Sequence, residues 1–247
     1  MDAGTIRTDV ADGIATVTFG HPKGNSLPGA LLTSLAAAIE TAGRNEAAQV
    51  IVLRSEGTGP FCAGASFDEF KTVKDAAEGK RFFSGFAQVI LAMIRAPKFV
   101  VARVQGKTAG GGVGLVAASD YALATSGAAL RLSELAVGIG PFVVGPVIEK
   151  RIGLGAFAAM AIDADWRSAE WGERHGLYAE LLPTADELDR RVAAFTAKLA
   201  GFNPEAMRRL KEVTWEGTAG WPALLAARAE ISGTLVLSDF TKRAIGA

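Results

Sequence analysis

Short apolar runs of the length of buried strands recur along this chain, separated by turns rich in small residues. Residues 5–10 and 14–19 alternate in polarity on either side of an Ala-Asp-Gly turn, which predicts a β-hairpin. Residues 49–54 and 98–104 are short and mainly apolar, as the buried strands of a sheet are. Each of these two runs leads into a turn of very small residues.

Apolar residues at helical spacing fill the intervals between the predicted strands. Two such stripes lie at Leu31, Leu32, Leu35 and Ile39 and at Phe82, Phe86, Val89 and Met93. Pro97 ends the second helix. Residues 112–119 predict a helix and residues 120–124 a strand, so that a glycine turn, a helix and two strands form a βαβ unit. Shorter helices are predicted for residues 146–152 and 167–175.

The last part of the chain shows helical signals only. Thr184 and Glu187 have the spacing of a capping box at the start of a helical stripe. Asn203 followed by Pro204 marks the start of the next helix. From about Asp186 the chain is therefore predicted to be helical almost to its end, as an addition to a β/α core.

Two small-residue turns carry the first indication of chemistry. Residues 61–66 read Phe-Cys-Ala-Gly-Ala-Ser, and residues 109–114 read Ala-Gly-Gly-Gly-Val-Gly. Backbone N–H groups approach a ligand closely only where side chains are absent or very small. Two such turns can direct two N–H groups at one oxygen, as the stabilisation of a thioester enolate or a tetrahedral oxyanion requires.

Other interpretations of the triple glycine remain open from the sequence. Gly112, Gly114 and Ala117 fit the spacing of a dinucleotide-binding fingerprint, but this fit begins inside the turn rather than at the end of a strand. A Gly-Gly-Gly run is also typical of a tight turn packed under a helix. Neither interpretation explains why a second small-residue turn stands one βαβ unit earlier.

Glu134 is the candidate acid/base group. It follows the next strand-like run and has apolar neighbours at a passage from strand to helix. An acidic residue there is favoured by the helix dipole, and it is equally a candidate general base. Taken alone, Glu134 does not decide between the structural and the catalytic role.

The composition and charge of the chain exclude several classes of protein. The 247 residues include 26 Lys and Arg and 26 Asp and Glu, so no net charge attracts nucleic acid or a membrane surface. Cys62 is the only cysteine, which excludes an intrachain disulfide and favours a small buried side chain over a nucleophile. The sequence shows neither a secretory signal nor an apolar run long enough for a membrane helix. We expect a soluble, cytoplasmic protein without a metal site.

Taken together, the motifs resemble those of the enoyl-CoA hydratase/isomerase (crotonase) family. Residues 22–27 are similar to its early Pro-Lys-x-Asn-x-Leu loop, and residues 61–66 to its Phe-Cys-Ala-Gly-Ala-Asp turn. Residues 106–120 resemble its second glycine signature, and residues 133–141 its Pro-Glu-x-x-x-Gly-x-x-Pro stretch. The last helix, at residues 235–242, is also similar.

The resemblance implies an α/β fold: a crotonase-like spiral of ββα turns with a C-terminal helical trimerisation region. It places the acyl-CoA-binding core at residues 1–185 and the helical oligomerisation region at residues 186–247. A homotrimer or a dimer of trimers is the implied assembly. Coenzyme A enters as part of an acyl-CoA thioester substrate, and no separate cofactor, nucleic acid or membrane partner is implied.

The resemblance also implies roles for individual residues. The N–H groups of Ala65 and Gly111 would hold the thioester carbonyl, and Glu134 would act as general acid/base at the α and β carbons. The adenine and pantetheine path would be lined by Ala63, Ala65 and Phe67. Lys23 would lie near the CoA phosphates.

Two departures from the family pattern bear on the reaction. Hydratases of the family use two glutamates around one water, and Gly114 stands where the first is expected. One remaining carboxylate suits double-bond isomerisation, in which a single base moves a proton from one carbon to another. Residues 142–144, Phe-Val-Val, replace small residues beside the acyl group and should reshape its pocket.

The sequence therefore predicts an enzyme of fatty acyl-CoA metabolism that performs enoyl-CoA hydration or isomerisation. An acyl-CoA decarboxylase or a thioester hydrolase would use the same two N–H groups. A non-catalytic acyl-CoA-binding protein would keep the pocket and lack the chemistry, and Glu134 argues against that alternative.

Overall fold

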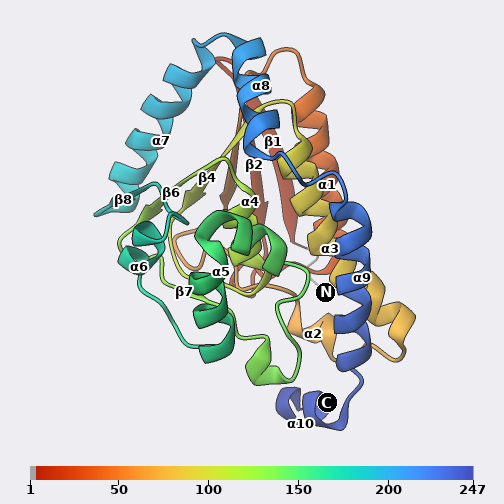
Figure 1. Cartoon of the computed structure of the whole chain (residues 1–247). Helices are drawn as coiled ribbons and strands as arrows, with labels where there is room; N and C mark the ends of the chain where they lie inside the picture. Colours follow the sequence, from red (N-terminus) through yellow and green to blue (C-terminus); the bar gives the residue numbers. More distant parts are fainter. Residues whose placement is uncertain (1–3, 247) are drawn as a thin grey trace.

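A six-stranded sheet forms the centre of the molecule (Figure 1). The structure, a computed structural model, describes residues 4–246. In chain order, the strands of this sheet are β1 (Thr5–Ala11), β2 (Ile14–Gly20), β3 (Val50–Ser55), β4 (Phe99–Val104), β6 (Tyr121–Thr125) and β8 (Glu180–Leu182). They lie side by side in this same order. The first pair is the predicted antiparallel hairpin, and all other neighbours are parallel.

The two faces of the sheet have separate apolar cores because side chains alternate along each strand. Ile51 and Leu53 of β3 belong to the larger core, which lies under most of the helices. Val50 and Val52 point to the other face, into a smaller core. Both faces are therefore covered, as expected for a mainly parallel sheet.

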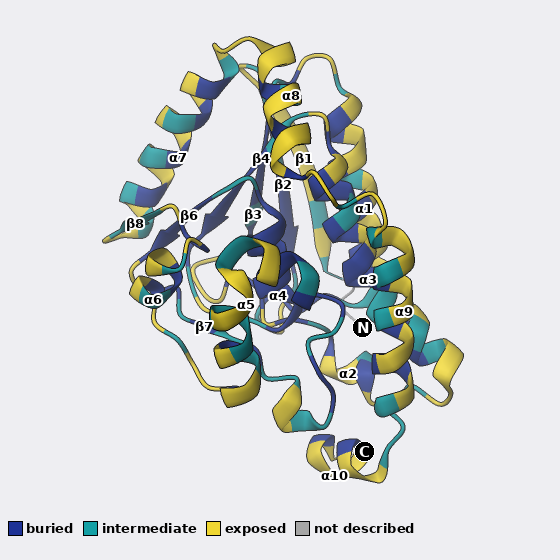
Figure 2. Cartoon of the chain, in the orientation of Figure 1, coloured by how far each residue is buried: buried dark blue, intermediate teal, exposed yellow. Residues whose placement is uncertain are grey.

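Helices α1 (Gly29–Arg44), α3 (Ala76–Arg95) and α9 (Trp221–Leu235) lie side by side next to the sheet (Figure 1). Their buried stripes face inward, and their other faces are exposed (Figure 2). The stripes predicted from Leu31 and Phe82 onward are confirmed as the inner faces of α1 and α3.

Helix α4 (Gly111–Ala118) is buried along its whole length, and α5 (Gly145–Asp163) packs against it. The prediction of a helix at residues 146–152 was too short. Gly153 has a φ of +79°, and the helix resumes beyond this interruption. Helix α6 (Ala169–Arg174) is shorter than predicted because the Ser168 side chain caps its first turn.

A second, two-stranded sheet lies next to the two small-residue turns. Strand β5 (Thr108–Ala109) pairs in parallel with β7 (Leu130–Arg131). These strands, together with α2 (Phe67–Phe70) and the 3₁₀ turn η1 (Leu135–Val137), were not predicted because two to four residues are too few to show a period.

The predicted helical C-terminal part is confirmed as α7 (Ala185–Ala200), α8 (Pro204–Thr214), α9 and α10 (Asp239–Ile245). Thr184 accepts a hydrogen bond from the Glu187 N–H, and Asn203 caps α8. Helix α7 covers the smaller core with Leu188 and Val192. The assembly of this part into trimers remains a prediction.

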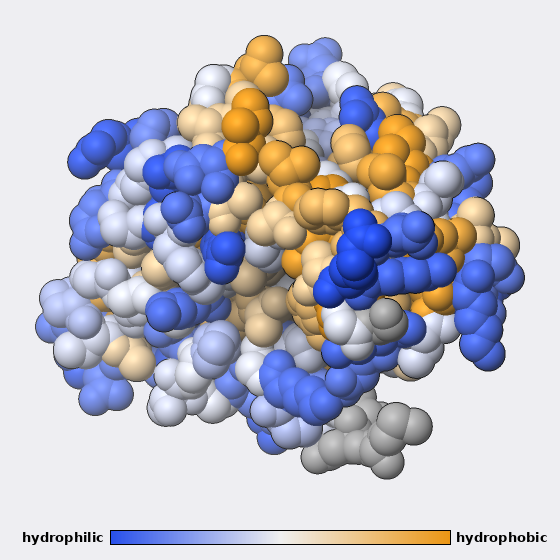
Figure 3. Space-filling model, turned by 90° about the horizontal axis from the view of Figure 1, so that it is seen from below, coloured by the Kyte–Doolittle hydropathy of each residue, from blue (hydrophilic) through white to orange (hydrophobic). Residues whose placement is uncertain are grey.

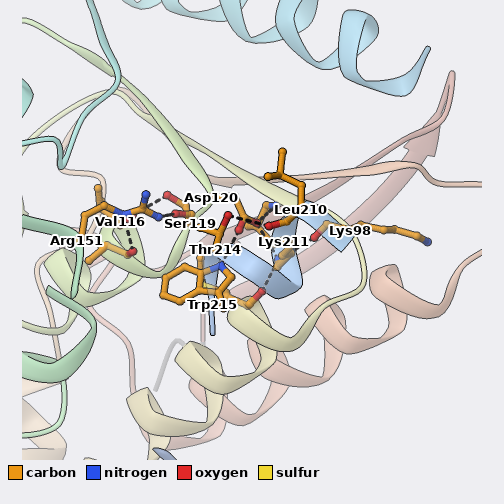
Figure 4. Close-up of polar contacts among 12 residues, drawn as sticks. Lys98, Val116, Ser119, Asp120, Arg151, Leu210, Lys211, Thr214 and Trp215 are labelled. Atoms are coloured by element: carbon orange, nitrogen blue, oxygen red, sulfur yellow. Dashed lines mark hydrogen bonds and ion pairs between the residues drawn. The ribbon is translucent and has the colours of Figure 1, made fainter. Parts of the chain in front are cut away.

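A buried ion pair holds α8 against the sheet (Figure 4). Lys211 Nζ lies 2.8 Å from the carboxylate of Asp120 and donates to the backbone oxygens of Met93 and Lys98. The other Asp120 oxygen accepts a hydrogen bond from Trp215 Nε1 at 2.7 Å. Both charges are almost fully removed from solvent and are paired, as buried charges must be. Among residues 4–246, no helix is long and apolar enough to cross a membrane.

Candidate active site

The two small-residue turns predicted from the sequence lie next to each other. The N–H of Phe61 donates to the carbonyl of Lys107, and the N–H of Ala109 donates to the carbonyl of Cys62, both at 2.9 Å. Cys62 and Thr108 form a parallel bridge. The first turn is thereby fixed alongside the strand that leads into the second.

Glycines allow the turns to approach closely. A Cβ on Gly64, which has a φ of +92°, would lie 3.0 Å from the carbonyl oxygen of Ala109 and 3.7 Å from the nitrogen of Gly111. A Cβ on Gly112 would lie 2.7 Å from the Cβ of Cys62. Such contacts leave no room for side chains at these positions.

The predicted oxyanion-hole residues, Ala65 and Gly111, both line one pocket. Leu27 forms two backbone hydrogen bonds with the residues on either side of Ala65: its N–H donates to the Gly64 carbonyl, and its carbonyl accepts from the Ser66 N–H. The N–H of Ala65 itself takes no part in this pairing. Gly111 is the first residue of α4, where N–H groups have no partner within the helix. Neither N–H group has a hydrogen-bond partner within residues 4–246, so both are available to a ligand.

Glu134 lines the same pocket, immediately before η1. A Cβ on Gly110 would lie only 3.2 Å from Glu134 Oε1, so the carboxylate stands against the second turn. Glu134 Oε2 is buried and has no hydrogen-bond partner among the described residues. Burial raises the pKa of Glu134 from 4.5 to about 7, and the N–H groups of Glu134 and Ser133 oppose this with a smaller effect.

The whole pocket has a volume of about 90 Å³. Apart from Glu134, its lining is mainly apolar. Its aromatic lining consists of Phe67, Phe70, Phe82, Phe83, Phe86 and Phe142. The bulky segment 142–144 lines it as predicted. On the face of the molecule seen in Figure 3, apolar side chains gather between hydrophilic ones.

Gly114 lies inside the packed helix α4 rather than on the pocket wall. A Cβ at this position would stand 2.6 Å from Val144 Cγ1 and 2.9 Å from Val144 Cβ. Val144 thus fills the space that a larger side chain at position 114 would need. Within the described part of the chain, Glu134 is the one acidic residue that lines the pocket.

The residues predicted to contact CoA border the outer part of the site. Ala63, Ala65 and Phe67 line the pocket, and Phe67 is 51% exposed. Lys23 does not line it, but the adjacent Gly24 accepts a hydrogen bond from the Ala63 N–H at 3.1 Å. Lys23 is exposed and pairs with Asp68. Its role near the CoA phosphates remains a prediction.

Cys62 is not a nucleophile in this geometry. Its side chain is fully buried beneath the two turns, and burial raises the pKa of the thiol to about 12. The expectation of a small buried side chain is confirmed.

Comparison with known proteins agrees with this arrangement. The sequence model of the enoyl-CoA hydratase/isomerase family matches residues 9–232, nearly the whole chain. The chain belongs to this family. A protein of Rhodobacter capsulatus named "Probable enoyl-CoA hydratase" is 30% identical, and the match covers 95% of this chain and 91% of that protein.

Two further relatives of this chain are named for other reactions. The trans-2-decenoyl-[acyl-carrier-protein] isomerase of Streptococcus mutans is 22% identical over all of this chain and 95% of its own. In Rhodococcus jostii, the (7aS)-7a-methyl-1,5-dioxo-2,3,5,6,7,7a-hexahydro-1H-indene-carboxyl-CoA hydrolase is 29% identical over 85% of this chain and 80% of its own.

Solved structures support the fold. An enoyl-CoA hydratase from Bacillus halodurans superposes with a TM-score of 0.89 at 20% identity, and one from Mycobacterium avium subsp. paratuberculosis with 0.86 at 23%. Each comparison covers 98% of both chains. The predicted crotonase-like α/β fold is confirmed.

Sequence reasoning missed the contribution of the C-terminal helices to the pocket. Ser232 of α9 lines it, although 98 residues separate Ser232 from Glu134. No local pattern indicates such a contact, because it depends on how α9 crosses α3.

Proposed function

We propose that this chain moves a proton on the acyl group of a CoA thioester, with Glu134 as the base and the N–H groups of Ala65 and Gly111 as the oxyanion hole. The observation that carries the proposal is the Glu134 carboxylate, one oxygen of which is buried without a partner among the described residues, in the same pocket as the N–H groups of Ala65 and Gly111. A base with a pKa of about 7 suits proton transfer at neutral pH.

The proposed reaction has two proton transfers. Glu134 takes a proton from a carbon activated by the thioester, and the electron pair of the broken C–H bond delocalises onto the thioester oxygen. The N–H groups of Ala65 and Gly111 donate hydrogen bonds to this enolate oxygen as its charge develops. Glu134 then returns the proton to another carbon of the conjugated system, which shifts the double bond and regenerates the carboxylate.

Isomerisation is the first choice within this chemistry because it needs only one carboxylate. Hydration by the same site would require Glu134 to activate the water and also to deliver the proton to carbon. The packing of Val144 against Gly114 leaves no place for a second carboxylate at that position. The similarity to the Streptococcus mutans isomerase favours the same choice, whereas the Rhodobacter capsulatus relative supports hydration.

A hydrolase is the second candidate, because the Rhodococcus jostii relative is named as one. A thioester hydrolase would use the two N–H groups for a tetrahedral oxyanion, and Glu134 would activate water. Release of free CoA distinguishes this reaction from isomerisation. For either reaction we propose that Lys23, Ala63, Ala65 and Phe67 hold CoA and that the protein works as a homotrimer or a dimer of trimers.

The first experiment follows a panel of 2-enoyl- and 3-enoyl-CoA thioesters in D₂O by mass spectrometry. A shifted double bond without added water supports isomerisation, and deuterium in the product shows that the proton on Glu134 exchanges with solvent before it is returned. A mass gain of one water molecule supports hydration, and free CoA supports hydrolysis.

The variant Glu134→Gln tests the base. Turnover should fall by about 10² to 10⁴-fold, because the amide cannot accept the proton, while binding of the thioester changes little. Glu149→Gln, at an exposed position of α5, is the matched control and should keep full activity. If Glu134→Gln retained wild-type turnover, Glu134 would not be the base.

A further inference from the structure

Ser232 places a hydroxyl group in the pocket without a protein partner. The residue is 1% exposed, and it lines the pocket from the side of α9. Serine and threonine inside helices commonly donate to the carbonyl four residues earlier, as Thr234 does on the same helix and Thr214 does on α8. The Ser232 hydroxyl makes no such bond within residues 4–246, and its oxygen is not among the fully buried atoms that lack a partner, so it keeps a small opening toward the pocket.

The way α9 crosses α3 fixes the position of Ser232. Gly233, the next residue, lies against Gly79 of α3 so closely that a Cβ on Gly79 would stand 2.6 Å from Gly233 Cα. A Cβ on Gly233 would stand 2.5 Å from the backbone nitrogen of Lys80. This backbone contact brings α9 to the pocket wall, next to the helix that supplies Phe82 and Phe83.

The surroundings of Ser232 differ from those of the reacting groups. Ser133 and Glu134 enter the pocket from the segment after β7, close to the glycine turn. Ser232 enters from a helix of the C-terminal part, where the apolar residues Phe70, Phe82 and Val236 form a cluster. Its hydroxyl is therefore a polar group in an otherwise apolar wall.

We infer that Ser232 recognises an uncharged oxygen on the acyl group of the substrate, a ketone or a hydroxyl remote from the thioester. This inference rests on the proposed function, since it assigns the acyl group to this pocket. A carboxylate is a poor fit because no Lys, Arg or His among the described residues lines the pocket.

The hydroxyl of Ser232 should affect the free energy with which different acyl groups bind. A purely hydrocarbon acyl group would remove Ser232 from water and leave its hydroxyl unsatisfied. An acyl group with an oxygen at this point would complete the hydrogen bond. A site with a buried hydrogen-bonding group rejects the analogue that lacks the partner, and we expect a preference of about tenfold for one hydrogen bond between neutral groups.

The test compares thioesters that differ only in this oxygen. An eight-carbon 3-enoyl-CoA and its counterparts with a ketone at the sixth or seventh carbon are assayed for kcat/KM and for binding by calorimetry. Wild-type protein should favour one of the ketones about tenfold. Ser232→Ala should remove this preference by lowering kcat/KM for the ketone alone, whereas Thr234→Ala, with its exposed and already bonded hydroxyl, should not change it.

Each outcome has one meaning. Equal use of all thioesters by the wild type, or an equal loss on all of them in Ser232→Ala, overturns the role of Ser232 and leaves the proposed chemistry intact. If no thioester reacts but binding still favours a ketone in a Ser232-dependent way, the proposed chemistry fails and the role of Ser232 is supported. Absence of both reaction and preferential binding overturns both.

Discussion

The Glu134 carboxylate is unusual because its burial is compensated only in part: the N–H groups of Glu134 and Ser133 favour the charged form, but their effect is smaller than that of burial. One of its oxygens has no hydrogen-bond partner, and no cation lines its pocket. The ionised form is therefore costly, and the pKa rises to about 7. The property that makes Glu134 an effective base thus also makes it a source of instability when it is ionised.

The pH dependence of turnover follows from this pKa. Only the carboxylate form of Glu134 accepts a proton, so kcat/KM should rise with pH and level off above about 7. At pH 5, two units below the midpoint, we expect a rate about 10²-fold lower than the plateau. The measurement is a pH profile with one thioester. A midpoint near 4.5 would mean that the carboxylate is solvated during the reaction.

The buried Glu134 should make the stability of wild-type protein, relative to Glu134→Gln, depend on pH in the opposite sense from that of a salt-bridged acid. The folded state holds the Glu134 proton up to about pH 7, while the unfolded chain releases it near pH 4.5. Wild-type protein therefore loses free energy of unfolding as the pH rises through this window. Urea unfolding should show Glu134→Gln to be more stable than wild type at pH 8, by at most about 3 kcal/mol, and nearly equal at pH 4.5.

A second prediction at the residue scale concerns Gly114 and Val144. Gly114→Glu alone should lower the free energy of unfolding by about 1–3 kcal/mol and add no hydratase activity, because its Cβ would collide with Val144. Val144→Gly removes both colliding atoms. We expect water addition to enoyl-CoA to appear only in the double variant, with Val144→Gly alone as the control. Hydration by Gly114→Glu alone would show that the helix shifts to accommodate the side chain.

Some residues of the candidate site can be predicted from the sequence, and others cannot. The turns that contain Ala65 and Gly111 are visible as runs of small residues, and the structure brings them together with Glu134 in one pocket. The environment of Glu134 is not visible, since it depends on Gly110 and on burial. No sequence pattern indicates Ser232, because its position in the pocket depends on how α9 crosses α3.

Helices and strands can be predicted from the sequence where the pattern of apolar residues repeats over enough positions. The hairpin and the helices α1 and α3 follow from alternation and from helical stripes. The small strands β5 and β7 do not, although their pairing places the glycine turn beside the segment that leads to Glu134. Short elements of this kind form because the tertiary structure supplies their partners.

The buried pair between α8 and β6 gives a prediction about elements. Lys211→Met should lower the free energy of unfolding by about 3–5 kcal/mol, because it leaves the Asp120 carboxylate buried without its cation. Arg44→Met removes an exposed pair with Glu40 on α1 and should change it by less than about 0.5 kcal/mol. Both are measured by urea unfolding. Equal effects would mean that Asp120 is neutralised by other groups.

At the scale of the whole molecule, the C-terminal helices are part of the core and of the pocket. Helix α7 covers one face of the sheet, and α9 supplies Ser232. The division into a core at residues 1–185 and a helical region at residues 186–247 therefore describes the order of elements along the chain, while the packing joins the two. The predicted trimer would add contacts beyond these.

Helix α10 connects the C-terminal part of the chain to the segment that contains Glu134. A Cβ on Gly138, which ends η1, would stand 2.5 Å from the ring of Phe240 and from Thr241 Oγ1. Thr241 is fully buried, and its hydroxyl donates to the carbonyl of Leu235. Helix α10 thus packs against the end of η1 at Gly138, four residues beyond Glu134.

Removal of residues 239–247 should therefore act on Glu134 from a distance. Without α10, water reaches η1 more easily, the burial of the carboxylate decreases, and the pKa of Glu134 falls from about 7 toward 4.5. The shortened chain should keep its sheet, as judged by circular dichroism, while the midpoint of its pH–rate profile moves to lower pH. Phe240→Ala should produce a smaller shift in the same direction. An unchanged midpoint in a folded, shortened protein would show that the burial of Glu134 is set by the glycine turn and the pocket wall alone.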